Sequence, residues 1–193
     1  VLDVFPRYGS FPGFHPLMDP RLMWWNVLGP GGVKELLWLE RQEGYAAVIL
    51  ESQPVARGDA MVVFSHGGRN AVPVEMAREC RRRGLQVVAV TCAANQPKLA
   101  EHADVVIDNC VPPEDALVAV EGWPHKVAAG STAAAVLIAM ALVAEVAQEL
   151  SRHGISLPVF VSPNVPDVAP DHNLRVFEEY ARVMKRQAAH GGD

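Results

Sequence analysis

The residues best suited to chemistry lie where an apolar segment, residues 60–64, stops at a serine and two glycines follow. Small residues let the oxygens of an anion approach the backbone, while hydroxyl and amide side chains add hydrogen-bond donors. A helix-like segment starts next, so the unpaired N–H groups of the turn carry the positive end of the helix dipole. The pattern predicts that a phosphorylated small molecule is held by Ser65, His66, Gly67, Gly68, Arg69 and Asn70.

This turn matches neither of two well-known phosphate-binding motifs. The Gly-Lys-Ser/Thr ending of a Walker loop is absent, and so is the Gly-x-Gly-x-x-Gly fingerprint. The simpler alternative is an ordinary strand–helix turn in which Asn70 caps the helix.

Further hydroxyl groups stand at two other element ends. Thr91 follows the next apolar strand, and Ser131 and Thr132 open the longest helix. Each is either a ligand contact or a local structural contact, and for the last two the alternative is a helix cap. The sequence leaves both roles open.

Two residues are candidates for proton transfer. Glu75 lies near the start of the helix after the glycine turn, where a carboxylate also suits the helix dipole. His172 lies in Pro170-Asp171-His172-Asn173, and a loop histidine beside an aspartate can act as an acid or base near neutral pH. The alternative for that loop is a helix cap by Asp171 or Asn173.

The elements that must position these residues alternate between short apolar strands and helices. Strands of this kind are buried on both faces, which predicts a parallel sheet in a three-layer α/β fold. Ligands of such sheets bind at the carboxyl ends of the strands, where Ser65, Thr91 and Asp108 fall. The expected strands are 60–64, 86–90, 105–107 and 159–161, and the expected helical segments are 33–50, 72–83, 131–152 and 174–186. A short segment at 98–102 lies between the second and third strands.

The overall composition fits one domain over residues 1–193, with an aromatic, Pro- and Gly-rich connection at 7–30 and a C-terminal helix and tail at 174–193. The net charge of −5 comes without a basic stripe, so we expect no nucleic-acid partner and no membrane partner. The three cysteines have no metal-type spacing, which predicts reduced thiols and a cytoplasmic location. The apolar run 133–144 is shorter than the roughly 20 residues of a membrane span and predicts a buried helix.

Residues 65–77, and above all Asn70-Ala71-Val72-Pro73-Val74-Glu75-Met76-Ala77, resemble the SIS (sugar isomerase) domain family, most closely an uncharacterised single-domain bacterial branch. The resemblance continues in residues 103–110, 131–132, 158–164 and 171–173. It implies a flavodoxin-like three-layer sandwich with five parallel strands, a phosphorylated sugar as ligand and a homodimer or larger assembly. Ser65 and Gly68 match the family's Ser-x-Ser-Gly loop, and Ser131 and Thr132 match its later hydroxyl pair.

The chain departs from the family pattern in three places. Gly67 stands where a second serine is usual, and the loop after Thr91 is short. The family's first strand is not found, so the chain is expected to begin inside the helix that follows it. These departures affect the expectation of catalysis more than that of binding.

Three functions are open on this basis. An isomerase or related lyase would use Glu75 and His172 to move a proton between adjacent carbons, with no metal or organic cofactor. A sugar-phosphate sensor would bind without turnover, as the missing serine favours. A nucleotide-binding flavodoxin-like domain is the third, and it lacks an acidic residue placed for a ribose. We also predict a homo-oligomer, because the aromatic connection and the apolar helix are more than one small domain should expose.

Overall fold

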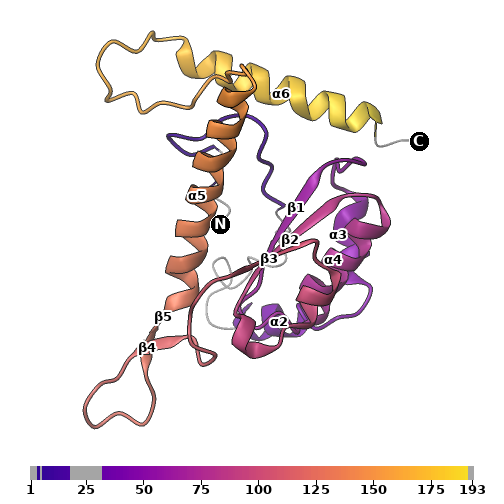
Figure 1. Ribbon diagram of the computed structural model, residues 1–193, viewed down its shortest axis with the longest axis vertical. Helices are drawn as coiled ribbons and strands as arrows, with labels where there is room; N and C mark the ends of the chain where they lie inside the picture. Colours follow the sequence, from indigo (N-terminus) through magenta and orange to yellow (C-terminus); the bar gives the residue numbers. More distant parts are fainter. Residues whose placement is uncertain (1–3, 5, 18–31, 191–193) are drawn as a thin grey trace. The chain divides into compact units, whose positions relative to one another are not determined.

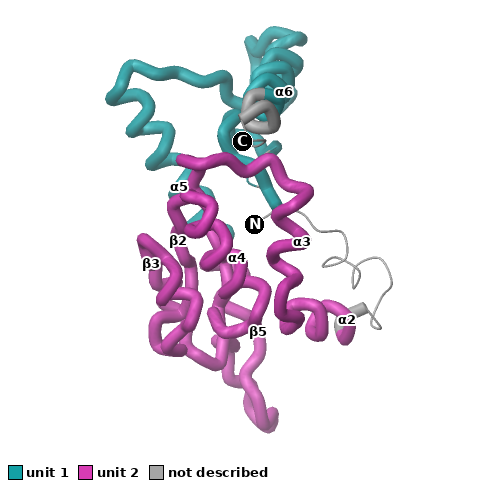
Figure 2. The backbone as a smooth tube through the Cα atoms, turned by 90° about the vertical axis from the view of Figure 1, so that its right-hand side faces the viewer, with its two compact units in different colours: residues 1–17, 136–193 teal, residues 18–135 magenta. Residues whose placement is uncertain are grey.

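The computed structural model describes residues 4, 6–17 and 32–190, and the chain divides into two compact units. Figure 2 colours them: one unit comprises residues 1–17 and 136–193, and the other comprises residues 18–135. Trp24 and Trp25, two aromatic residues of the predicted connection, lie outside the described residues. Each unit is described below by itself.

The unit of residues 18–135 contains a parallel sheet. Its strands β1 (Ala60–Phe64), β2 (Gln86–Thr91) and β3 (Val105–Asp108) lie in the order β1-β2-β3. The register pairs Val62 with Val88 and Val90 with Ile107. Helix α4 (Ala71–Arg82) connects β1 to β2 and packs against both strands, and helix α3 (Tyr45–Glu51) packs against α4 (Figure 1). The α/β class and the parallel pairing are confirmed.

Helix α4 forms because its apolar residues fall on one face. Val72, Met76, Ala77 and Cys80 recur at helical spacing and are all buried. Charged side chains lie outside this face, and Glu79 pairs with Arg82 of the helix and with Arg83, the residue that follows it. These guanidinium groups hold the pKa of the Glu79 carboxyl near 2, below its ordinary 4.5. The predicted helix 72–83 is therefore confirmed within a residue at each end.

The predicted helical segment 33–50 is two helices. Helix α2 (Gly32–Leu39) ends before a short turn, and α3 begins after Gly44. Gly44 has φ of 81°, which a helix interior does not allow. The short segment 98–102, for which the sequence predicted no type of structure, is a 3₁₀ helix, η5 (Lys98–His102).

Two expectations about the sheet are wrong. The proline-containing segment after β3, where the sequence predicted no strand, forms an antiparallel hairpin of β4 (Ala116–Val118) and β5 (Val127–Ala129). Residues 159–161 form no strand, because their backbone groups bond elsewhere in their own unit. The N–H of Phe160 donates to Ser10, and the Asn173 side chain bonds both the N–H and the C=O of Val161.

The sheet of the described residues thus has three parallel strands, and the five-stranded sandwich stays a proposal. The expectation that every strand is buried on both faces also fails at β3. This strand lies at the edge of the sheet, and Val105 and Val106 are about half exposed.

The described aromatic residues of the N-terminal connection, Tyr8, Phe11 and Phe14, pack within the unit that contains α6 (His172–His190). Tyr8 stacks on Phe160, with ring centroids 4.9 Å apart, and Phe160 contacts Phe177 edge to face. Phe11 is buried against Phe14. Among the described residues, this part of the connection therefore no longer argues for an oligomer.

Helix α5 (Gly130–Arg152) differs most from its expectation. Among the described residues it is the one helix long and apolar enough to cross a membrane by length and composition, which is weak evidence of a span. Only 17% of its most apolar window is buried, and Leu137 is 71% exposed. The prediction of a buried helix is wrong for this structure. An apolar sequence favours burial of a helix, but it does not determine which other surface the helix packs against.

Candidate functional site

The turn between β1 and α4 is held firmly at Gly68. Its N–H donates to Ser65 Oγ at 3.2 Å, and its C=O accepts the Leu99 N–H at 2.9 Å. Gly68 has φ of +57°, and a Cβ there would lie 2.4 Å from Pro97 Cβ and 2.8 Å from Thr91 Oγ1. Only glycine fits this conformation and this contact. The turn therefore depends on the segment that follows β2.

The backbone donors at the start of α4 are largely free. Among the described residues, no acceptor faces the N–H groups of Gly67, Arg69, Asn70 and Ala71. The next N–H, that of Val72, donates to the Glu40 carbonyl at 3.0 Å. The Asn70 side chain does not cap the helix, so the simpler alternative of an Asn70-capped turn is not what the structure contains. Unpaired N–H groups at the start of a 12-residue helix favour an anion.

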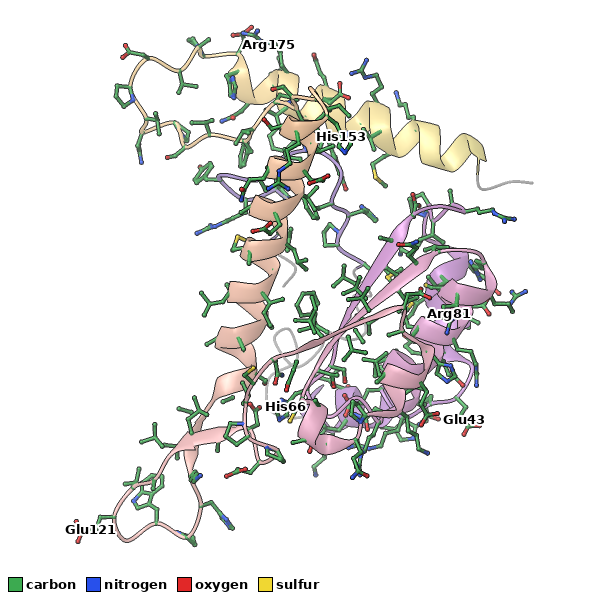
Figure 3. All side chains as sticks on the ribbon, in the orientation of Figure 1. Glu43, His66, Arg81, Glu121, His153 and Arg175 are labelled. Carbon is green, nitrogen blue, oxygen red and sulfur yellow. The ribbon has the colours of Figure 1, made fainter. Side chains whose placement is uncertain are left out.

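The His66 ring is bonded on both sides. Its Nδ1 lies 3.1 Å from Asn109 Nδ2 and its Nε2 lies 3.4 Å from the Pro113 carbonyl. Because the amide of Asn109 donates and the Pro113 carbonyl accepts, the ring carries its hydrogen on Nε2. Figure 3 labels His66 at the end of the sheet where the strands finish. This side chain ties the turn to the segment after β3.

Thr91 and Arg69 also contact neighbouring backbone. The Thr91 hydroxyl donates to the His66 carbonyl at 3.2 Å, and the residue is fully buried. The exposed Arg69 guanidinium donates to the Asn95 carbonyl. The predicted site residues from Ser65 to Asn70 and Thr91 thus come together, and within that group Thr91 faces protein rather than solvent.

The hydrogen-bond donors of Ser131 bond to an aspartate that the sequence pattern did not single out. Asp115, just before β4, accepts the Ser131 N–H at 2.7 Å through Oδ1 and the Ser131 hydroxyl at 2.9 Å through Oδ2. Its backbone carbonyl accepts the Gly130 N–H as well. The carboxylate of Asp115 therefore caps α5, and Ser131 has its donors in use while Thr132 is exposed. No sequence signal links residues 115 and 131, because the contact depends on the hairpin.

Glu75 and His172 each make structural hydrogen bonds. Glu75 Oε2 accepts a hydrogen bond from the N–H of Gly44, which precedes α3, at 2.7 Å. Arg78 Nη2 donates to Glu75 Oε1 at 3.3 Å. His172 belongs to the other unit and its Nε2 lies 2.7 Å from the Val159 carbonyl. Beside it, a hydrogen bond from Arg175 lowers the pKa of the Asp171 carboxyl below its ordinary value.

The cysteines are free thiols. Cys80 and Cys92 are buried and Cys110 is exposed. Burial raises the pKa of the Cys80 thiol to about 11, and Cys92 Sγ donates to the Val111 carbonyl at 3.1 Å. In the part of the chain that the structure describes, no group of three His, Cys, Asp or Glu residues could hold a metal ion.

Comparison with known proteins identifies the family. The SIS domain pattern matches residues 1–92. A UPF0309 protein of Oceanobacillus iheyensis is 34% identical over 188 residues, covering 92% of this chain and 74% of that protein. The chain belongs to the UPF0309 family of bacterial SIS-domain proteins.

Two other members of this family match at similar levels. The UPF0309 protein of Streptomyces coelicolor is 37% identical over 196 residues, covering 96% of this chain and 76% of the relative. The UPF0309 protein of Caldanaerobacter subterraneus is 32% identical over 195 residues, covering 95% of this chain and 77% of that protein. The resemblance inferred from the sequence is thus confirmed, while the name UPF0309 states no activity.

Proposed function

We propose that this UPF0309 protein binds a phosphorylated sugar at the turn between β1 and α4. The observation that carries the proposal is the set of N–H groups at Gly67, Arg69, Asn70 and Ala71, which have no acceptor among the described residues. A phosphate oxygen is the acceptor that such a helix start favours, because several donors and the helix dipole act on it together. Membership of the SIS-domain proteins supports a sugar phosphate over other anions.

Two side chains would add to this contact. Ser65 Oγ accepts one hydrogen bond from Gly68 and keeps its own hydrogen for a ligand. The Arg69 guanidinium, bonded to the Asn95 carbonyl, has further donors and adds positive charge beside the free N–H groups.

The second candidate is catalysis of an aldose–ketose isomerisation or a related lyase reaction. The hydrogen bonds of Glu75 to Gly44 and of His172 to Val159 favour structural roles for the two proposed proton-transfer residues. We therefore place binding without turnover, as in a sensor, ahead of catalysis. No metal or organic cofactor is needed for either function.

One experiment in D₂O tests both candidates. The protein is mixed with a panel of aldose and ketose phosphates and with the same sugars without phosphate. We expect broadened ligand signals and a higher melting temperature of the protein with a phosphorylated sugar only. At a ligand concentration of 100 times the dissociation constant, binding should raise the free energy of unfolding by about 2.7 kcal/mol. Proton signals at the carbons beside the carbonyl should persist. Their loss with the protein present would establish turnover, and the absence of binding to every phosphate would refute the proposal.

We also propose a homodimer or larger oligomer, with α5 as part of the contact. The support is the apolar and exposed character of this helix, in which Val136 and Leu137 lie open. Light scattering at micromolar concentration should give at least twice the mass of one chain. A monomer would contradict the proposal. The cytoplasmic location and the absence of a nucleic-acid or membrane partner stay predictions.

A further inference from the structure

We propose that the loop after β2 aims the Gly67 N–H at the ligand, and that Thr91 and Asn95 are positioning residues rather than ligand contacts. The inference rests on the proposed function of the turn. Three donors, one at the end of β2 and two in the loop after it, bond to the single carbonyl oxygen of His66. They are Thr91 Oγ1 at 3.2 Å, the Cys92 N–H at 3.1 Å and Asn95 Nδ2 at 3.4 Å.

The geometry of the peptide bond connects this carbonyl to the site. In a planar trans peptide, the C=O of one residue and the N–H of the next point in opposite directions. The donors that fix the His66 carbonyl toward the β2 loop therefore turn the Gly67 N–H away from it. The Gly67 N–H has no acceptor among the described residues, and a Cβ on Gly67 would meet nothing within 4 Å.

The orientation of this peptide decides between attraction and repulsion of an anion. If the peptide rotated, the negative end of the His66 carbonyl would face the phosphate in place of the N–H. Three hydrogen bonds oppose this rotation, and one of them comes from Thr91, which is fully buried and cannot adjust to solvent. The donor is therefore oriented before the ligand arrives, and the ligand does not bear the cost of ordering it.

The test compares Thr91→Val, which removes the hydroxyl at nearly constant shape, with Thr91→Ser, which keeps it. We expect Thr91→Val to raise the Kd for a bound sugar phosphate about tenfold, and Thr91→Ser to change it by less than about twofold. Asn95→Ala, at a half-buried position, should weaken binding in the same direction and serves if Thr91→Val does not fold. Circular dichroism establishes that each variant is folded.

A ligand-free measurement separates this inference from the proposed function. In NMR spectra without ligand, Thr91→Val should shift the His66 carbonyl carbon and the Gly67 amide, while Thr91→Ser leaves both near their wild-type positions. Unchanged signals in folded Thr91→Val would overturn the inference, as would changed signals with an unchanged Kd. Failure of the wild-type protein to bind any sugar phosphate would instead refute the proposed function.

Discussion

Replacing Gly67 by aspartate is expected to weaken sugar-phosphate binding at least about 100-fold while the protein stays folded. A Cβ at this position would meet nothing within 4 Å, so the larger side chain has room. Its carboxylate would compete for the free N–H groups at the start of α4 and would repel the phosphate. A 100-fold change in Kd corresponds to about 2.7 kcal/mol of binding free energy. This is within the range expected for one repulsive charge placed beside a bound anion. Calorimetric titration of the variant gives the Kd.

The matched control is Gly67→Asn, which has nearly the same size and no charge. We expect it to lose several-fold less affinity than Gly67→Asp, because the repulsion is absent. Equal affinities for the two variants would show that the charge at this turn has no effect on the ligand, and the phosphate would then have to bind elsewhere.

Replacing Gly68 by alanine should destabilise the protein by about 2–5 kcal/mol. The left-handed conformation at φ +57° costs a residue with a Cβ about 1–2 kcal/mol. The new Cβ would also lie 2.4 Å from Pro97 Cβ, and Pro97 is a buried, rigid ring. Overpacking of this kind costs about 1–3 kcal/mol more. Urea unfolding followed by circular dichroism measures the difference in the free energy of unfolding.

Gly67→Ala is the control for this prediction. It adds the same methyl group one residue away, in open space, and should change the free energy of unfolding by less than about 0.5 kcal/mol. If Gly68→Ala proved as stable as Gly67→Ala, the contact of the turn with Pro97 and Thr91 would be wrong. The two glycines thus differ in their surroundings: Gly67 has open space around it, and Gly68 allows close packing.

The sequence predicted the β1–α4–β2 unit almost to the residue. Periodicity is sufficient there because strand and helix each bury one set of residues against an adjacent element, as Val63 and Met76 do. It failed at residues 159–161, where apolar side chains suited a strand but the backbone groups bond to Ser10 and Asn173. Pairing partners far along the chain are not visible in a local pattern.

The sequence by itself determined that a turn with free donors follows β1, because glycine, strand end and helix start are local properties. Only the tertiary structure decided which polar side chains are already hydrogen-bonded to other parts of the protein. Thr91 and Ser131 were equally good donors in the sequence. In the structure the Thr91 hydroxyl is used by the His66 carbonyl and the Ser131 hydroxyl by the Asp115 carboxylate. The physical reason is that a buried polar group bonds to the nearest partner, and loops distant in sequence supply that partner.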